Sequence, residues 1–468
     1  MSELFQSPLA AALHHAVAHL SPAKEVSVAA TADLETLRRR LDMPLSEGGT
    51  EAVRVIDELV AGVEGGIIDS AGGRFFGWVI GGSLPAALAA DWMTSAWDQN
   101  AGLYACAPAA AVVEETAGRW LKELLHLPPG ASFALVTGCQ MAHATCLAAA
   151  RHAVLAKIGW DVEQEGLSGA PAIRILTGME KHATILRAVR LLGMGERHIT
   201  LLPVDARGRV LKEALASALA DAPSAPTIVV LQAGDVNTGE FDDFAELVPL
   251  AKERGAWVHI DGAFGLWAAA SPKLWHLVRG VELADSWATD GHKWLNVPYD
   301  CGYAFVADTA AHRASMSQKA SYLTHVAEAR DQMDWNPEFS RRGRGFATYA
   351  AIRQLGRSGV TELVERCCEH AHALVTRMGA LPGAEMVWEP IINQGLVRFL
   401  DPAGRDHDAF TERIMAEILA SGEAFFSGTT WGGRRTMRVS VSNWQTSAED
   451  VERVVRCVAG VLERARVG

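Results

Sequence analysis

The chain contains 468 residues, of which 49% are hydrophobic and 21% are charged. This composition is typical of a folded globular protein and excludes a disordered or fibrous one. The 43 Lys and Arg residues against 55 Asp and Glu residues give a net charge of −12, without a long basic run, so neither nucleic acid nor an anionic membrane surface is an expected partner. We expect the partner to be a small molecule.

The cysteines and the N-terminus indicate a cytoplasmic protein. The seven cysteines are odd in number and scattered, without the spacing of a zinc site or a disulfide framework, so no bound metal is expected. Residues 1–20 carry no Lys or Arg ahead of their apolar positions, unlike a secretory signal. No uncharged apolar run reaches the ~18 residues that a membrane helix needs.

Residues 1–70 predict a helical arm, because apolar residues such as Leu9, Leu13 and Val17 recur at helical spacing. An arm with one apolar face must pack against something. A second copy of the chain is a natural candidate, since two-fold homodimers are the commonest oligomers. The stretch 71–85 that follows is rich in glycine and aromatic residues, and irregular stretches of this kind are often functional.

From about 130 to 310, short apolar runs alternate with helical patterns. The predicted strands are 132–137, 173–176, 200–202, 227–231, 257–260, 286–289 and 303–306, and the helices include 141–158, 184–192 and 244–254. Strands that are apolar throughout and separated by helices predict an α/β fold with a mostly parallel sheet covered on both faces. In such sheets, ligands bind beyond the carboxyl ends of the strands.

The remaining chain predicts a second, smaller unit. Residues 311–345 are polar, with few strand signals, and we expect a mobile segment there. Helices are predicted at 346–355 and 360–378, strands at 385–388, 395–399 and 436–442, and a closing helix at 448–464. The expected division is therefore an N-terminal arm (1–70), a large domain (71–345) and a small α+β domain (346–468).

Lys293 directly follows a predicted strand and the turn at Asp290 and Gly291. Lysine is almost never fully buried unless it is paired, and loss of water lowers its pKa toward the range where the free amine is a nucleophile. Lys293 is therefore either a solvated loop residue or a lysine that forms an imine. In the second case Asp261 is its expected counter-charge.

Three other features follow predicted strand ends. Asp261 is either a turn or helix-capping residue or a carboxylate that pairs with a cation. Gly138, in the turn 137–140, marks either a simple turn or an anion site at a helix N-terminus. His182 either begins a helix with a satisfied hydrogen bond or stacks on a flat ligand. All three are expected at the same edge of the sheet as Lys293.

The order of anion turn, histidine, aspartate and lysine resembles the fold-type I enzymes that depend on pyridoxal 5′-phosphate (PLP). The similarity is to the amino-acid decarboxylases that act on aromatic amino acids, histidine or glutamate. It rests on HIDGAF at 259–264, GHKW at 291–294, the aromatic pair at 75–76, the spacing of Asn100, Tyr104 and Pro108, and the segment 437–443. The resemblance implies a mostly parallel seven-stranded sheet and a homodimer with the active site at the subunit interface.

The resemblance also implies a role for each matching residue. Lys293 would be the Schiff-base lysine and Asp261 the partner of the pyridinium nitrogen, with His182 over the ring and Ala263 beneath it. The residues implied around the phosphate are Gly138, Cys139, Gln140, Asp290 and His292. Those implied for the substrate are Trp97, Asn100, Tyr104 and Arg438, although an arginine on such a strand is more often a surface ion-pair member.

Three departures from the family pattern bear on the reaction. Cys139 and Gln140 replace small hydroxyl residues at the phosphate turn, and Asp290 stands where many members have asparagine. The stretch 332–339 has no tyrosine where aromatic amino acid decarboxylases carry a proton donor on a mobile loop. The expected reaction is decarboxylation of an L-amino acid, aromatic or apolar. The alternatives are an aldehyde synthase or aminotransferase, and a catalytically silent PLP-binding protein.

Overall fold

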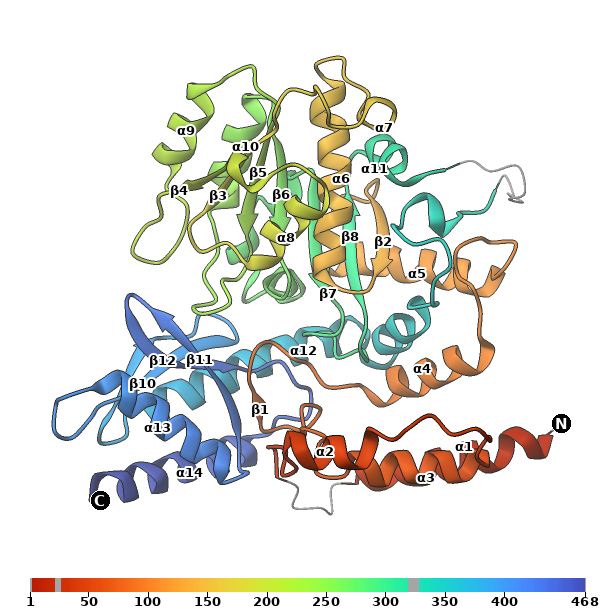
Figure 1. Ribbon diagram of the computed structural model, residues 1–468. Helices are drawn as coiled ribbons and strands as arrows, with labels where there is room; N and C mark the ends of the chain where they lie inside the picture. The colour runs from red at the N-terminus through yellow and green to blue at the C-terminus, as the bar shows by residue number, and fades with distance from the viewer. Residues whose placement is uncertain (1, 22–26, 319–327, 468) are drawn as a thin grey trace.

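The computed structural model describes residues 2–21, 27–318 and 328–467. A seven-stranded sheet with its helices forms the upper part of Figure 1, and a five-stranded sheet lies at the lower left. The long helix α12 (Gly345–Gly379) runs below the large sheet toward the small one, and the N-terminal helices lie beneath.

The seven-stranded sheet confirms the predicted α/β fold, and all seven predicted strands are present. The strand order is β2 (Ser132–Val136), β8 (Gly302–Val306), β7 (Ser286–Asp290), β6 (Trp257–Asp261), β5 (Thr227–Gln232), β3 (Arg174–Gly178) and β4 (Ile199–Leu202). Strand β8 is antiparallel to both of its neighbours, and the other neighbouring pairs are parallel.

These strands are mainly apolar because helices cover both faces of the sheet, although β7 also contains Ser286, Thr289 and Asp290. Ala134 and Val136 of β2 belong to one core, which also contains residues of α6 (Cys139–Ala156) and α8 (Ala183–Leu191). Phe133 and Leu135 belong to the opposite core, which contains residues of α5 (Pro108–Leu124) and α10 (Phe244–Glu253). The remaining helices of this part are α7 (Val162–Glu165), α9 (Lys212–Asp221) and α11 (Thr309–Met316). With both faces covered, the carboxyl ends of the strands are where a ligand can bind.

The smaller sheet has the order β1 (Phe75–Phe76), β11 (Phe425–Trp431), β12 (Arg434–Ser440), β10 (Gln394–Phe399) and β9 (Ala384–Trp388). Helices α13 (His407–Ala420) and α14 (Ala448–Val467) complete this part. The sequence predicts β9, β10, β12 and α14 but not β1, β11 or α13. Strand β1 is only two residues long and pairs with β11 from the other end of the chain. The domain boundary at residue 71 stays a prediction.

Helix α12 replaces the two helices predicted at 346–355 and 360–378. Between them Gly356 has φ 62° and ψ −179°, which is not helical. Glycine tolerates this positive φ because it has no Cβ. The helix therefore bends near the point where the sequence predicts a break.

The N-terminal arm consists of α1 (Ser2–His19), α2 (Leu34–Leu41) and α3 (Ala52–Val63), which confirms its helical character, and α4 (Pro85–Trp97) follows the glycine-rich stretch. Much of the apolar surface of α1 is uncovered, with Leu4, Phe5 and Leu9 at 74%, 69% and 58% exposure. Within the described ranges, no helix combines the length and apolarity needed to cross a membrane.

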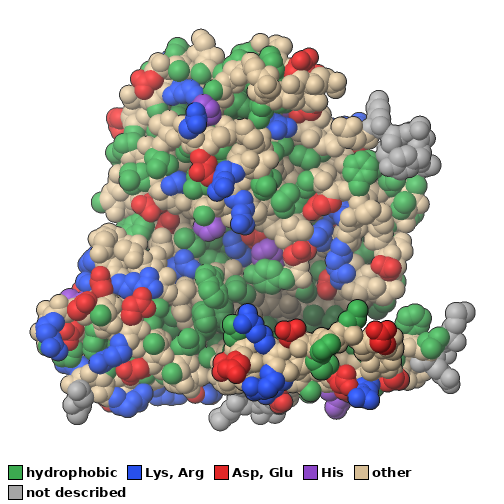
Figure 2. All heavy atoms as spheres, in the orientation of Figure 1, with side chains coloured by type: hydrophobic (Ala, Val, Ile, Leu, Met, Phe, Trp, Pro, Cys, Tyr) green, Lys and Arg blue, Asp and Glu red, His purple; other side chains and the backbone are tan. Residues whose placement is uncertain are grey.

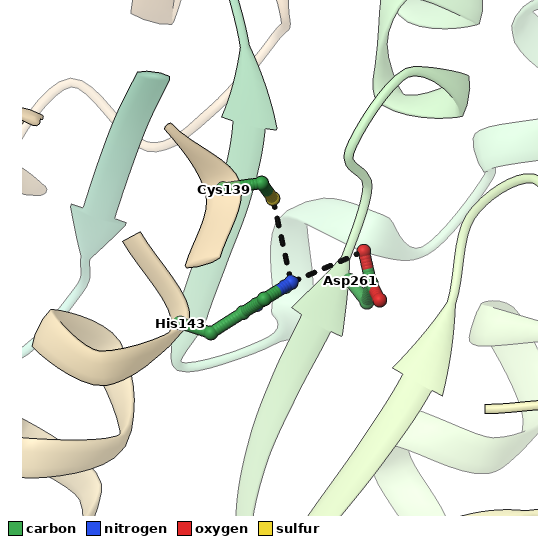
Figure 3. A group of neighbouring side chains, drawn as sticks. All are labelled: Cys139, His143 and Asp261. Atoms are coloured by element: carbon green, nitrogen blue, oxygen red, sulfur yellow. Dashed lines mark hydrogen bonds and ion pairs between the residues drawn. The ribbon is translucent and has the colours of Figure 1, made fainter. Parts of the chain in front are cut away.

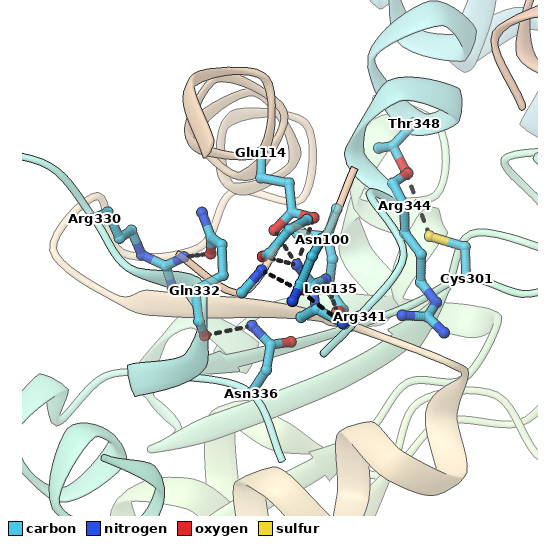
Figure 4. Close-up of polar contacts among 12 residues, drawn as sticks. Asn100, Glu114, Leu135, Cys301, Arg330, Gln332, Asn336, Arg341, Arg344 and Thr348 are labelled. Carbon is cyan, nitrogen blue, oxygen red and sulfur yellow. Dashed lines mark hydrogen bonds and ion pairs between the residues drawn. The ribbon is translucent and has the colours of Figure 1, made fainter. Parts of the chain in front are cut away.

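The chain from 328 to 345 is packed, which corrects the expectation of a mobile segment from 311 to 345. Residues 309–316 are helical, the 3-10 turn Gln332–Asp334 is buried, and residues 319–327 lie outside the described residues. The Arg341 guanidinium lies 2.8 Å from the Glu114 carboxylate and donates to the carbonyl of Leu135 (Figure 4). Both side chains of this ion pair are at most 1% exposed, so the pair ties the segment to α5 and β2.

Candidate active site

A cavity of about 360 Å³ lies at the carboxyl ends of the large sheet, within the ~300–1,000 Å³ range of small-molecule sites. All nine residues predicted around the cofactor line this one cavity: Gly138, Cys139, Gln140, His182, Asp261, Ala263, Asp290, His292 and Lys293. Figure 2 shows Lys, Arg and His side chains gathered near the middle of the visible face, above a hydrophobic area. Residues far apart in the sequence therefore meet as expected, while their individual roles stay predictions.

Lys293 forms an ion pair with Asp290, the last residue of β7. Lys293 Nζ lies 3.0 Å from Asp290 Oδ2, and the lysine side chain is 21% exposed. Burial alone would lower the pKa of the Lys293 amine, but Asp290, Cys139 and Asp261 together outweigh this effect and the pKa is raised, with Asp290 as the main contributor. The amine is therefore held in its protonated form, with Asp290 as the carboxylate in direct contact and Asp261 as a second negative charge nearby.

Asp290 has a second contact at the start of helix α6. Its Oδ1 accepts the backbone N–H of Cys139 at 2.6 Å, so the carboxylate satisfies one of the N–H groups that a helix N-terminus leaves unpaired. Its Oδ1 also lies 3.5 Å from His292 Nε2. These donors explain how an aspartate is accommodated where many relatives of the predicted family have asparagine.

Asp261 ends strand β6, next to β7 in the sheet. It is 4% exposed, and its Oδ1 accepts the Ala263 N–H at 3.2 Å and lies 3.5 Å from His143 Nε2. Burial alone would raise the pKa of this carboxyl, but His143, His182 and Lys293 lower it below its ordinary value. Asp261 therefore keeps a negative charge beside the cavity.

The turn before α6 has the properties of an anion site. Both polar atoms of the Gln140 side chain are buried, with no hydrogen-bond partner in the described part of the chain. At Gly138 a Cβ would come within 3.0 Å of the His292 ring, so the glycine allows the two segments to lie close together. The N-terminus of α6, a helix of 18 residues, adds positive potential at the same place.

His182 and His292 both line the cavity. His182 is the N-cap of α8 and its Nδ1 accepts the Thr184 N–H, so the capping interpretation is correct, and the ring also lines the cavity. The His292 ring stacks on Tyr299, with 4.2 Å between centroids and 25° between planes. Tyr299 also lines the cavity. Sequence reasoning missed it, although it lies in the same loop as Lys293.

The residues predicted for the substrate are not among the described residues that line this cavity: Trp97, Asn100, Tyr104 and Arg438. Asn100 Oδ1 accepts the backbone N–H of Arg341, in the packed segment described above. Arg438 is 7% exposed in β12 of the smaller sheet. Their roles stay predictions.

Comparison with known proteins identifies the family. Residues 35–400 match the model described as the pyridoxal-dependent decarboxylase conserved domain. The chain is 24% identical over 463 residues to an aromatic-L-amino-acid decarboxylase of Bacillus atrophaeus, covering 96% of this chain and 93% of that protein. It is 27% identical over 374 residues to a 4-hydroxyphenylacetaldehyde synthase of Rhodiola rosea, covering 76% and 74%. The crystal structure of Oryza sativa TDC with PLP and tryptamine has a TM-score of 0.91 and 23% identity, covering 100% of this chain and 98% of that one.

The matched region spans most of the chain, so the protein belongs to the pyridoxal-dependent decarboxylase family. It is an enzyme of the PLP-dependent carboxy-lyase class. The family, the cofactor and the enzyme class predicted from the sequence are thereby confirmed.

The residues at the cavity fit PLP by their chemistry. The Lys293 amine suits the aldehyde, the buried negative charge of Asp261 suits a protonated ring nitrogen, and the partnerless Gln140 amide beside a helix N-terminus suits the phosphate. Each of the three groups lines the same cavity, so one PLP molecule matches all of them.

Gly81, in the glycine-rich stretch, gives a test of how tightly the lysine loop is held. A Cβ at Gly81 would lie 1.8 Å from the backbone oxygen of Lys293, so Gly81→Ala must displace that backbone. We expect a loss of about 1–3 kcal/mol in the free energy of unfolding, measured by urea denaturation, together with a lower PLP content. Gly130→Ala is the matched control, because a Cβ there meets nothing within 4 Å. An equal free energy of unfolding for the two variants would contradict the close approach of Gly81 to the backbone of Lys293.

Proposed function

We propose that the protein converts an L-amino acid to its amine and CO2, with PLP attached covalently to Lys293. The proposal rests on one observation, the convergence of Lys293, Asp261 and Gln140 on a single cavity. An aromatic amino acid is the proposed substrate. Support comes from the similarity to an aromatic-L-amino-acid decarboxylase.

Bound PLP supplies an electron sink for the electron pair left when the bond between Cα and the carboxylate breaks. Asp261 keeps the ring nitrogen protonated. At ~4 Å and an effective dielectric of ~20 such a pair is worth roughly 4 kcal/mol, about three pKa units. Lys293 must release a proton before its amine can attack an aldehyde, and Asp290 is the carboxylate in contact with it. His182 is the ring that we propose to orient the substrate carboxylate.

Tyr299 favours the amine as product over an aldehyde. The stretch 332–339 has no tyrosine, but Tyr299 brings a phenol to the same cavity. The Tyr299 residue is 60% exposed, but the loss of part of the water around it raises its pKa above the ordinary value of 10.0, with Lys293 opposing this rise and Asp290 adding to it. The phenol is therefore protonated at neutral pH and is a proton source for Cα. Aldehyde synthesis stays the second candidate, because the similarity to 4-hydroxyphenylacetaldehyde synthase extends over 76% of the chain.

Product analysis tests the reaction directly. We expect purified holoenzyme, incubated with each proteinogenic L-amino acid, to release CO2 and amine in equal amounts from at least one aromatic substrate. Lys293→Ala should lose both this activity and the visible absorbance of bound PLP. CO2 accompanied by aldehyde, ammonia and peroxide would replace the proposal with aldehyde synthesis, and a keto acid without CO2 would indicate an aminotransferase. Bound PLP whose spectrum no amino acid changes would indicate a catalytically silent protein.

Asp290→Asn tests the ion pair at Lys293. The amide keeps an oxygen for the Cys139 N–H but removes the negative charge that stabilises the protonated amine. The pKa of Lys293 should therefore fall by about one unit or more, and the pH profile for the rate of PLP attachment to apoenzyme should shift to lower pH. The control is Asp300→Asn, because Asp300 pairs with Arg344 instead. Identical pH profiles for Asp290→Asn and the wild type would show that Asp290 does not set the lysine's protonation.

We also propose that the protein works as a cytoplasmic homodimer with the active site at the subunit interface. The exposed Leu4, Phe5 and Leu9 of α1 supply apolar surface for a second copy, and the seven cysteines are free thiols, as a reducing compartment requires. Light scattering after size exclusion should give twice the chain mass of 50.2 kDa. A mass of 50.2 kDa at micromolar concentration would exclude the dimer.

A further inference from the structure

Two buried histidines behind Asp261 have no part in the function proposed above. His143 lies on α6 and His259 on β6, and both are 0% exposed. His143 Nε2 is 3.5 Å from Asp261 Oδ1 and 3.4 Å from Cys139 Sγ, as Figure 3 shows. A buried ring needs hydrogen-bond partners for both of its nitrogens, and the partners of the second nitrogen lie deeper in the sheet.

The contacts continue from Asp261 into the sheet as a single chain of hydrogen bonds. His143 Nδ1 lies 2.9 Å from His259 Nε2, and His259 Nδ1 lies 2.9 Å from Ser286 Oγ. Ser286 Oγ in turn accepts the indole N–H of Trp257 at 2.9 Å. All of these side chains are buried, so water cannot substitute for any of the partners.

Both histidines are neutral. Burial lowers the pKa of His143, and burial is the main cause that lowers the pKa of His259 to about 3. A neutral imidazole has one N–H and one bare nitrogen. Two neutral rings that are hydrogen-bonded to each other must therefore both donate in the same direction along this series of hydrogen bonds.

The charge on Asp261 selects that direction. If these hydrogen bonds ran toward Ser286, the bare Nε2 of His143 would lie 3.5 Å from the Asp261 carboxylate, an unfavourable contact between two acceptors. The weak thiol donor of Cys139 would then be the proton source for Nε2. If they run toward Asp261, the Ser286 hydroxyl donates to His259, His259 Nε2–H donates to His143, and His143 Nε2–H points to the carboxylate. Trp257 can only donate, so it fills the acceptor site of Ser286 in either case.

We propose that Trp257, Ser286, His259 and His143 form a directional hydrogen-bond relay that orients Asp261 toward the ring nitrogen of PLP, with His143 as a positioning residue. The proposal rests on the function proposed above, which assigns Asp261 to that nitrogen. Among the described residues, the side-chain contacts of Asp261 both involve Oδ1, which leaves Oδ2 for the cofactor. The relay thus holds the carboxylate in place without neutralising it.

The same atoms allow a competing interpretation as a metal site. The ligand atoms of Cys139, His143 and Asp261 all lie within 4.8 Å of one another. A metal would need the bare nitrogen of His143 at Nε2, which is the opposite tautomer from the one the relay requires. The two interpretations therefore make opposite predictions for His143, and one set of variants separates them.

The test measures the dissociation constant of PLP from apoenzyme by titration of the visible absorbance. His143→Phe removes the donor and should weaken PLP binding about tenfold or more, by analogy with residues that support metal ligands. His143→Gln places an amide N–H near the position of Nε2 and should recover most of the affinity. Ser286→Ala removes the donor to His259 and should give an intermediate loss, although it lies two residues beyond His143 in the relay.

Ser132→Ala is the matched control, because Ser132 Oγ bonds a buried histidine, His312 Nδ1, at 2.8 Å without any link to Asp261. Ser132 and Ser286 both pair with Val306, from either side of β8. The control should bind PLP as the wild type does. If His143→Phe does not fold, the relay is tested by comparing the PLP affinity of Ser286→Ala with that of Ser132→Ala.

Three results would overturn the relay. They are wild-type affinity in His143→Phe or Ser286→Ala, an affinity in His143→Gln as weak as in His143→Phe, and stoichiometric Zn²⁺ binding to apoenzyme in competition with PLP. A wild-type protein without visible PLP absorbance, or a Lys293→Ala variant that keeps it, would instead reject the function proposed above.

Discussion

The ion pair between Lys293 and Asp290 is the contact on which the site depends. A lysine at the end of a buried strand is unfavourable unless a charge compensates it, and Asp290 provides that charge at 3.0 Å. At an effective dielectric of ~20, an ion pair at this range is worth about 4 kcal/mol or more. The same carboxylate bonds the first N–H of α6, so one side chain joins the lysine loop to the helix that begins at the anion turn.

The two carboxylates of the site are distinguished by their partners. Asp290 contacts a cation and a helix N-terminus, whereas Asp261 contacts a neutral histidine and one backbone N–H. A carboxylate already paired with a lysine cannot serve the ring nitrogen as well. Asp261 keeps a negative charge with one oxygen uncommitted, and this arrangement is what an electron-sink cofactor requires at its nitrogen.

The sequence predicts the large sheet well because strands covered on both faces are mainly apolar along their length. It also predicts nine residues that line the cavity, since the carboxyl ends of parallel strands must meet at one edge, but the four residues predicted for the substrate are not among the lining residues. The sequence does not predict which side chains the cavity residues contact. The direct contact of Lys293 is with Asp290, in addition to the predicted charge of Asp261, because three residues of turn place the amine back over the end of its own strand. The support from His143 is also hidden, since a lone histidine within a helix gives no sign of which strand it faces.

Strand β11 and the packed segment after 328 are the clearest misses in the fold. Strand β11 contains Gly428 among polar residues, and its place is set by pairing with β12 and with the distant β1. The chain near Arg341 is polar and looks like a loop, but its buried ion pair with Glu114 holds it in place. In both cases contacts between residues distant in the sequence override the local conformational preference. The pattern of a single sequence does not reveal such contacts.

Reductive trapping tests the central claim most directly. Holoenzyme is treated with borohydride, which fixes PLP to the amine that holds it, and the protein is then digested and its peptides are sequenced by mass spectrometry. The account predicts one modified residue, Lys293, in the peptide that spans the end of β7. Modification of a different lysine, or an unmodified Lys293 in protein that shows the visible absorbance of bound PLP, would contradict it.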